Sequence, residues 1–308
     1  MRRIVVGSRG SRLALIQAEW VLAKLKEAHP SLPLSLTKIT TTGDRDSRLF
    51  PKGGTGERIF VKELEEALLD GRIDVAVHSL KDLPTQIPQG LSLAAVPARL
   101  DPRDVLVSRG GKLSELAPGA RIGTGSPRRA VQLLAHRPDL EVAGVRGNVD
   151  TRLRKLYSDE LDGVILAAAA LTRLGWEDRI TEYLPLEHFL PAVGQGALGI
   201  EIRGDDAETA ALLSPLNHQP TWSSMVAERT FLREVGGGCR APIAALGTVI
   251  EDRLRLEGMV ASPSQRVVLR ASEEGNPLAP DEVGARLARR LLEMGALEII
   301  AEARLRWE

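Results

Sequence analysis

The chain has 308 residues, room for two or three ordinary domains, and its 43% apolar content allows sizeable cores without disulfides or metals. Lysine plus arginine and aspartate plus glutamate both number 41, so a zero net charge gives no general attraction to nucleic acid or membranes. The single cysteine excludes a disulfide framework and a cysteine-rich zinc site, and the five histidines lack ligand-like spacing, so no metal is expected. No stretch approaches the roughly 18–20 apolar residues of a membrane helix. These features predict a soluble protein of the reducing cytoplasm.

Short apolar strands alternate with amphipathic helices in the first third of the chain. Strands are predicted at residues 4–6, 34–40, 73–77 and 91–96, with helices around 13–21 and 60–68. This β-then-α rhythm predicts a largely parallel sheet with helices on both faces.

The same rhythm restarts after a break rich in proline and aspartate at residues 97–104. Strands are predicted around 122 and at 141–145, 163–167 and 198–202, and a second crossing segment at 190–196. Two similar α/β lobes joined by two crossings would enclose a cleft. No sequence repeat links the lobes, so their similarity rests on the rhythm alone.

The last part of the chain has a different order of elements. A helix around 225–232 precedes alternating strands at 243–249, 254–260 and 266–271, and a helix at 283–292 follows. This order predicts a small α+β domain with an antiparallel sheet, reached through a linker at 214–220. The expected domains are residues 1–96 with 196–214, residues 99–192, and residues 218–308.

Positive charge is concentrated in the second lobe. Residues 121–155 hold eight cations and only three acids, although the whole chain is neutral. Within this stretch, residues 123–129 follow a strand and open a helix, where Ser126 suits the N-cap and Pro127 the first helical position. A helix start of this kind presents backbone N–H groups and the positive end of the helix dipole to an anion.

Arginines reinforce this predicted anion site. Arg128 and Arg129 add planar donors that match carboxylates, and Arg146 and Arg152 follow at a second glycine turn. The alternative is an arginine-rich face in contact with solvent. Two helix starts of this type in one lobe favour anion binding.

The first lobe has a matching strand-to-helix turn at residues 7–12, which offers Arg9 and Ser11. A second segment, 78–84, lies at the end of the predicted strand 73–77, where open α/β sheets place their ligands. Asp82 in this segment, ionised among cations, could stabilise a cationic intermediate or relay protons. The alternative is a plain turn, in which Asp82 bonds nearby backbone or pairs with Lys81.

Cys239 lies in a glycine-rich loop that follows a predicted helix. Three glycines, 236–238, make a hinge, and Arg240 would favour the thiolate. A lone cysteine is most often a buried small hydrophobe, but a polar, flexible loop is a poor context for a core residue. A thiol that tethers a group is at least as well supported as a turnover nucleophile.

Together these segments resemble the porphobilinogen deaminase (hydroxymethylbilane synthase) family over nearly the whole chain. The matching motifs occur in order at residues 7–11, 60–65, 78–84, 123–129, 146–148, 190–196 and 236–239. The resemblance implies an α/β fold with two lobes like type II periplasmic binding proteins around a cleft, plus a small C-terminal α+β domain.

The resemblance also implies a chemistry. A dipyrromethane cofactor would be bound by thioether to Cys239, and four porphobilinogen units would add in turn, each losing ammonia, before water releases linear hydroxymethylbilane. Asp82 would be the catalytic carboxylate. The expected partner is porphobilinogen, without nucleic acid or membrane, and the expected state is a monomer. The implied cofactor-binding residues are Cys239, Ser79, Lys81, Thr124, Ser126, Arg128, Arg129 and Arg146, and the substrate-binding residues are Arg9, Ser11, Arg152, Arg173 and Gln195.

One segment departs from the family pattern. The family often has a Gly-Gly-Lys-Gly type of loop before the helix that starts near Phe60, whereas Glu57 stands here where that lysine would fall. Arg58 or Lys52 could take its place. We expect residues 53–58 to form a mobile cover over the cleft.

Other classes of function compete with this interpretation. A two-lobed protein that binds a small anion without catalysis would explain the arginines but not the cysteine loop. A thiol-dependent hydrolase or transferase would use Cys239 as nucleophile and His218 as base. A nucleic-acid binder is disfavoured because the basic cluster lacks interleaved aromatic residues.

Overall fold

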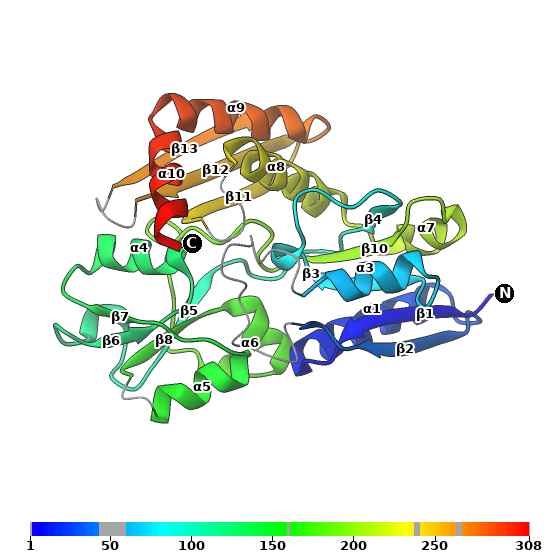
Figure 1. Cartoon of the computed structure of the whole chain (residues 1–308), viewed down its shortest axis with the longest axis horizontal. Helices are drawn as coiled ribbons and strands as arrows, with labels where there is room; N and C mark the ends of the chain where they lie inside the picture. The colour runs from blue at the N-terminus through cyan, green and yellow to red at the C-terminus, as the bar shows by residue number, and fades with distance from the viewer. Residues whose placement is uncertain (1, 43–59, 159–160, 237–240, 263–266, 308) are drawn as a thin grey trace. The chain divides into compact units, whose positions relative to one another are not determined.

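A computed structural model describes residues 2–42, 60–158, 161–236, 241–262 and 267–307 (Figure 1). The chain divides into two compact units. The first unit comprises Met1–Leu100 and Ala197–Trp222, and the second comprises Asp101–Gly196 and Ser223–Glu308. Each unit is described by itself below.

The first unit is built on a five-stranded sheet with the order β2-β1-β3-β10-β4. β1 pairs in parallel with β2 and β3, whereas β10 is antiparallel to both β3 and β4. The strands are β1 (Ile4–Arg9), β2 (Leu34–Ile39), β3 (Val75–Ser79), β4 (Leu91–Ala95) and β10 (Leu198–Arg203), and the helices are α1 (Arg12–Ala28), α3 (Lys62–Leu69) and α7 (Ala207–Leu213).

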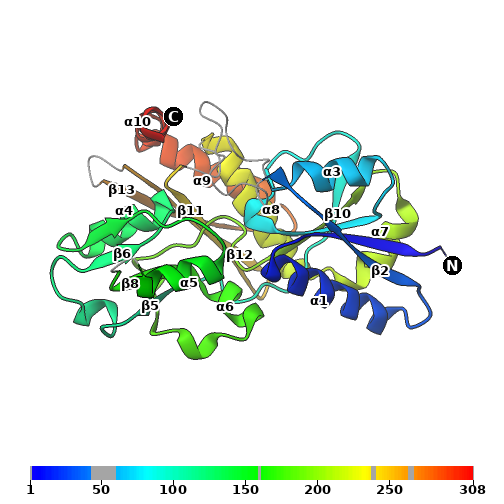
Figure 2. The same cartoon turned by 60° about the horizontal axis from the view of Figure 1, so that its bottom comes forward.

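Helices cover both faces of this sheet, as Figure 2 shows for α1 and α3. Alternation along β3 explains this, because Val75 and Val77 pack with α1 residues while Ala76 packs with Leu64 and Leu68 of α3. The prediction of helices on two faces is confirmed.

The second unit contains a five-stranded sheet with the order β7-β6-β8-β5-β9. β6 is parallel to β7 and β8, and β5 is antiparallel to β8 and β9. The strands are β5 (Asp104–Ser108), β6 (Arg121–Gly123), β7 (Glu141–Ala143), β8 (Gly163–Ala167) and β9 (Glu182–Tyr183), and the helices are α4 (Pro127–His136), α5 (Val149–Ser158) and α6 (Ala168–Leu174).

The two sheets share one topology, position by position, so the predicted similarity of the lobes is confirmed. The expectation of largely parallel sheets is wrong, because half of the pairings in each sheet are antiparallel. Each antiparallel pairing involves β5 or β10. The hydrophobic periodicity of a strand does not depend on the direction of its neighbours, so the sequence pattern could not reveal these pairings. The sequence pattern does not predict β5, because its first residue, Asp104, falls within the proline- and aspartate-rich break at 97–104.

The C-terminal domain of the second unit is an antiparallel α+β structure, as predicted. The sheet order is β11-β12-β13, and the helices pack against it (Figure 1). The linker is shorter than expected, because α8 already begins at Gln219. The elements are α8 (Gln219–Val235), β11 (Ile243–Ile250), β12 (Arg253–Ala261), β13 (Val268–Gly275), α9 (Pro280–Glu293) and α10 (Ala296–Trp307).

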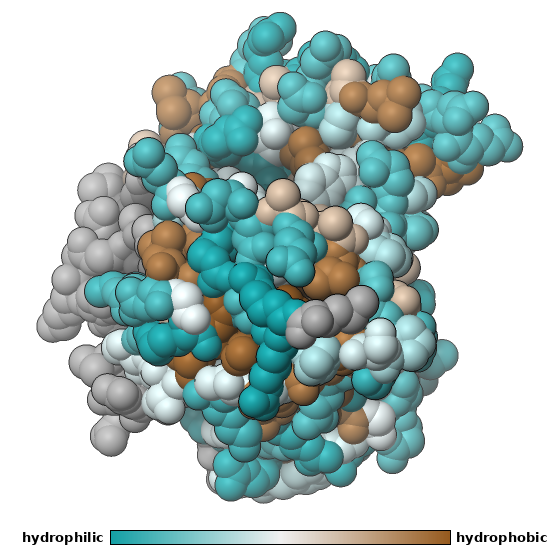
Figure 3. Space-filling model, turned by 90° about the vertical axis from the view of Figure 1, so that its right-hand side faces the viewer, coloured by the Kyte–Doolittle hydropathy of each residue, from teal (hydrophilic) through white to brown (hydrophobic). Residues whose placement is uncertain are grey.

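The surface is mainly hydrophilic on the face shown in Figure 3, where apolar residues occur in small groups. Among the residues that the structure describes, no helix is both long enough and apolar enough to cross a membrane. Within the same residues, no cluster of three or more histidine, cysteine, aspartate or glutamate side chains could hold a metal ion.

Candidate functional site

Two predicted site segments meet at one edge of the first unit's sheet. β1 ends at Arg9 and β3 ends at Ser79, and the two strands are parallel neighbours, so their carboxyl ends lie side by side. The Arg9 guanidinium lies over the Phe60 ring, with Cζ 4.1 Å from the ring centroid. Ser11 caps α1 by accepting the Ala14 N–H at 3.4 Å. Arg9 and Ser11 therefore lie at the carboxyl end of β1, on the same edge as Ser79.

The turn that carries Asp82 is anchored on both sides. The Ser79 hydroxyl exchanges hydrogen bonds with the Gln17 amide at 2.9 and 3.1 Å, which fixes the end of β3 to α1. Leu80 is buried, and its N–H donates to the Ala197 carbonyl at 3.0 Å. Asp82 itself is exposed, at the end of a short 3₁₀ turn. A fixed backbone thus presents an accessible carboxylate at the ligand edge, with half-buried Lys81 beside it.

A buried side-chain contact involves the residue that precedes this turn by two positions in β3. His78 Nε2 is 3.0 Å from Glu201 Oε2, and both side chains are almost completely excluded from solvent. The two residues come from the neighbouring strands β3 and β10. The contact joins the strand before the Asp82 turn to the strand that returns from residues 190–196, and sequence analysis missed it because the partners are far apart in the chain.

The second unit carries hydroxyls at the corresponding edge. β6 ends at Gly123, and Thr124 and Ser126 follow before α4 begins at Pro127. Ser126 occupies the predicted N-cap position, but its side chain makes no capping hydrogen bond; its N–H donates to Thr124 Oγ1 at 3.2 Å. A Cβ at Gly125 would lie 2.6 Å from the Val145 carbonyl oxygen, so only glycine fits there. The Ser126 hydroxyl therefore does not cap α4.

Arg128 and Arg129 converge on a buried acid that sequence analysis missed. Asp104, with 0% exposure, accepts Arg128 Nη1 at 2.7 Å and the Nε and Nη2 of Arg129 at 3.0 and 2.7 Å. Although burial raises the pKa of Asp104, the charges and hydrogen bonds of the two arginines hold it well below its usual value. Burial also lowers the pKa of Arg128. One carboxylate against two guanidiniums leaves the cluster with one net positive charge.

Gln195 joins the same cluster from the second crossing segment. Its Nε2 donates to Asp104 Oδ1 at 2.8 Å and to the Pro102 carbonyl at 2.7 Å. Arg173, on α6, donates to the Gly196 carbonyl at 3.0 Å, and burial lowers the pKa of Arg173 to about 10, so it stays charged at neutral pH. The second crossing segment is therefore held to Asp104 through Gln195 and to α6 through Arg173.

Arg146 and Arg152 flank the glycine turn after β7. Gly147 has a φ of +112°, which a side chain would strain, and Arg152 Nε donates to its carbonyl at 2.8 Å. Arg146 is exposed and Arg152 half-buried. Since β6, β7 and β8 are parallel, the Arg146 turn, residues 124–126 and the start of β5 all lie at one edge of the sheet.

The predicted residues thus form two groups, one on each unit. The first unit brings together Arg9, Ser11, Ser79, Lys81 and Asp82, and the second brings together Thr124, Ser126, Arg128, Arg129, Arg146, Arg152, Arg173 and Gln195. Cys239 and the loop with Lys52, Glu57 and Arg58 lie outside the described residues. The position of Asp104, opposite the end of β8, could have been found only from the antiparallel pairing of β5.

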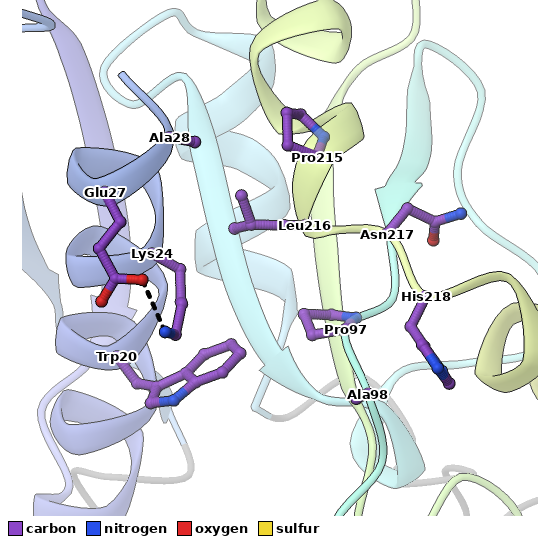
Figure 4. Close-up of a pocket in the computed structure, with 10 residues that line it drawn as sticks. All are labelled: Trp20, Lys24, Glu27, Ala28, Pro97, Ala98, Pro215, Leu216, Asn217 and His218. Atoms are coloured by element: carbon purple, nitrogen blue, oxygen red, sulfur yellow. Dashed lines mark hydrogen bonds and ion pairs between the residues drawn. The ribbon is translucent and has the colours of Figure 1, made fainter. Parts of the chain in front are cut away.

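A separate pocket of about 510 Å³ lies in the first unit, away from these residues. Figure 4 shows α1 contributing Trp20, Lys24 and Glu27 on one side and residues 215–218 on the other. Lys24 is paired with Glu27 at 2.7 Å, and the side-chain Oδ1 of Asn217 accepts the Val96 N–H. Because Lys24 is neutralised by Glu27 and most of the lining residues are apolar, this pocket does not suit a polyanion. His218, the base of the hydrolase alternative, lies here, with Nδ1 2.8 Å from Thr221 Oγ1.

The described geometry defines a class of protein: two α/β lobes that share one mixed-sheet topology, each with polar and cationic residues at the carboxyl end of its parallel strands, and an added α+β domain. Among solved structures, the BenM effector binding domain with its effector benzoate is similar at 15% identity, with a TM-score of 0.42, over 72% of this chain and 94% of that chain.

Comparison with protein families gives a more specific result. Residues 4–211 match the "Porphobilinogen deaminase, dipyromethane cofactor binding domain" model, and residues 222–293 match that family's C-terminal domain. A porphobilinogen deaminase of Desulforudis audaxviator is 52% identical over 98% of both chains. One of Pelotomaculum thermopropionicum is 50% identical over 98% of this chain and 97% of the relative. The chain belongs to the porphobilinogen deaminase family, so the predictions of a transferase and of a dipyrromethane-binding domain are confirmed.

Proposed function

We propose that this chain adds four porphobilinogen molecules, one after another and each with loss of ammonia, to a dipyrromethane held as a thioether by Cys239. Water then releases linear hydroxymethylbilane, and the dipyrromethane stays on the enzyme. The observation that carries this proposal is the cationic ligand edge of the second unit, where Arg146, Arg152 and the Asp104 cluster accompany the hydroxyls of Thr124 and Ser126.

The residues of this edge fit a dipyrromethane. Each pyrrole ring of such a group carries carboxylates, which guanidiniums and hydroxyls bind well. Arg128 Nε is buried and has no hydrogen-bond partner among the described residues, and a ligand carboxylate would satisfy such a donor. The Ser126 hydroxyl is not used by the helix, and Gly125 leaves no side chain in the way. Thr124, Ser126, Arg128, Arg129 and Arg146 would hold the group, together with Ser79 and Lys81.

When bound, the dipyrromethane supplies the nucleophilic pyrrole carbon to which the first substrate is joined. Asp82 supplies the anion that the reaction needs, because loss of ammonia from an aminomethylpyrrole leaves a cation. As an exposed carboxylate on an anchored turn, it can hold a proton of the pyrrole nitrogen or of the departing amine. Arg9, Ser11, Arg152, Arg173 and Gln195 would bind the carboxylates of substrate and growing chain.

The chain would act as a cytoplasmic monomer with porphobilinogen as its partner. Its three domains, at 1–96 with 196–214, at 99–192 and at 218–308, would have different roles. In this division the third domain carries the tether and the first two carry the ligand edges.

Intact-mass measurement tests the function. The purified chain should be heavier than its sequence by one dipyrrole, and Cys239→Ser should abolish this increment. Porphobilinogen should then produce heavier species in steps of one pyrrole. An anion-binding protein or a thiol hydrolase would show the plain sequence mass before and after porphobilinogen, and that result would refute the proposal.

A further inference from the structure

Residues 186–196, here called the strap, pack against both the second lobe and the C-terminal domain within the second unit. Phe189 packs in the lobe core with Leu106 and Ile165. The next residue, Leu190, packs with Ala244 and Met259 of the C-terminal sheet. Val193 belongs to the core of the C-terminal domain. Within a few residues the strap therefore passes from one hydrophobic core to the other.

A buried carboxylate fixes the strap to the C-terminal domain. Glu228 of α8 has 0% exposure, and its Oε2 accepts the Gly194 N–H at 2.7 Å while Oε1 accepts the Gly247 N–H of β11 at 2.8 Å. Charge-assisted bonds of this kind are stronger than neutral ones. Gly194 has a φ of +74°, in the region that glycine favours, which lets the strap turn its N–H towards the helix.

The helix that carries Glu228 is itself held closely. A Cβ at Gly284 of α9 would lie 2.5 Å from the Ala227 carbonyl oxygen, and a Cβ at Gly247 would lie 3.0 Å from the Ser224 backbone. Two missing side chains thus allow α9 and β11 to approach the α8 backbone closely within the turn that precedes Glu228. Figures 1 and 2 both show α8 against the sheet formed by β11, β12 and β13. This close packing of α8 holds the Glu228 carboxylate in a fixed position.

The residue after Gly194 continues the connection into the arginine cluster. Gln195 Nε2 donates to Asp104 at 2.8 Å, and Asp104 binds the guanidiniums of Arg128 and Arg129. A continuous path of hydrogen bonds and one turn of backbone therefore runs from Glu228 to both arginines. At its other end, α8 stops at Val235, four residues before Cys239 in the sequence.

We propose that Glu228 is a positioning residue, which fixes the Gln195–Asp104–arginine cluster relative to the helix that leads to the cofactor-bearing cysteine. This inference rests on the proposed function, since only a tethered polyanion needs a constant distance between its attachment point and its carboxylate ligands. The growing chain would then meet the same arginines at each addition.

Glu228→Gln tests the inference. The amide keeps the size of the side chain but offers one acceptor, so an NH₂ group faces one of the two backbone N–H groups. The matched control is Glu302→Gln in the same domain, where Glu302 accepts the Ser262 hydroxyl at 2.9 Å. The measurements are kcat and KM for porphobilinogen, the masses of the pyrrole-bearing species during turnover, and the unfolding temperature.

The expected result is a folded Glu228→Gln enzyme whose kcat/KM falls about tenfold to a hundredfold, with partly extended chains accumulating on the protein, while Glu302→Gln matches the parent. A merely structural role would lower the unfolding temperature and leave kcat/KM and the mass distribution unchanged at a temperature where the variant is folded. That outcome overturns the inference.

If Glu228→Gln yields no folded protein, Gly194→Ala makes the same comparison. It keeps the carboxylate and displaces the N–H group, because alanine is strained at this φ. Parent-like kinetics in that variant likewise overturn the inference. A parent enzyme without an attached dipyrrole is a different failure: it refutes the proposed function, and the inference falls with it.

Discussion

The two sheets of this protein share one strand order, but the acids at their corresponding edges differ in burial. In the first unit, Asp82 is exposed on an anchored turn. In the second, Asp104 is fully buried and its carboxylate is occupied by two guanidiniums and one amide. The first acid is accessible to a substrate, and the second is part of the framework that orients arginines. Topology determines where side chains meet, whereas burial determines what a carboxylate can do there.

The largest effect is expected from the exposed acid. Asp82→Asn should lower kcat by about a hundredfold or more, because an amide can neither hold a proton nor offset a cationic pyrrole. Intact mass should still show the attached dipyrrole. Asp70→Asn, which changes another exposed acid of the same unit, is the control and should retain full activity. Near-normal turnover of Asp82→Asn would remove Asp82 from the mechanism.

The buried acid should be needed for stability first. Asp104→Asn leaves two buried guanidiniums without their counter-charge, and the loss of one partner from a buried ion pair costs about 3–5 kcal/mol. Urea unfolding measures this loss, with Asp82→Asn as the exposed counterpart that should change little. Equal unfolding midpoints for the two variants would contradict the contrast between the edges.

The pH dependence of stability should follow the same contrast. Burial raises the pKa of Asp104, but Arg128 and Arg129 outweigh it and hold the pKa below the unfolded value of about 3.9. A depressed carboxyl pKa stabilises the fold above the unfolded pKa, and this contribution disappears as the pH falls below it. The stability difference between the parent and Asp104→Asn should therefore be constant near neutral pH and shrink below about pH 4. A difference that grows on acidification would contradict this assignment.

The smallest effects concern two serines in equivalent turns. Ser11→Ala removes a side-chain cap from α1 and should cost about 1 kcal/mol in unfolding experiments. Ser126→Ala removes no cap, so its unfolding free energy should change by less than about 0.5 kcal/mol. Binding should show the reverse order, because the Ser126 hydroxyl is available to a ligand carboxylate. A stability loss at Ser126 equal to that at Ser11 would mean that its hydroxyl does cap α4.

Local sequence patterns predicted the strand-to-helix turns well, since Ser11, Ser126 and Pro127 occupy the positions that helix starts favour. Asp104 could not be recognised, because its role depends on pairing between strands more than fifty residues apart in sequence, Asp104 opposite Ala167. The His78–Glu201 contact is hidden for the same reason. Nothing local to Arg128 and Arg129 shows that they share a carboxylate.

The order of strands in the first sheet has a consequence for synthesis of the protein. β10 lies between β3 and β4, yet the chain reaches it only at Leu198, after the whole of the second lobe. A chain emerging from the ribosome can complete the sheet of residues 104–183 first. At that stage β10, the strand that pairs with both β3 and β4, has not yet been synthesised. Until then their facing edges are open to pairing with other chains, so this interval of translation is where a chaperone would be of most use.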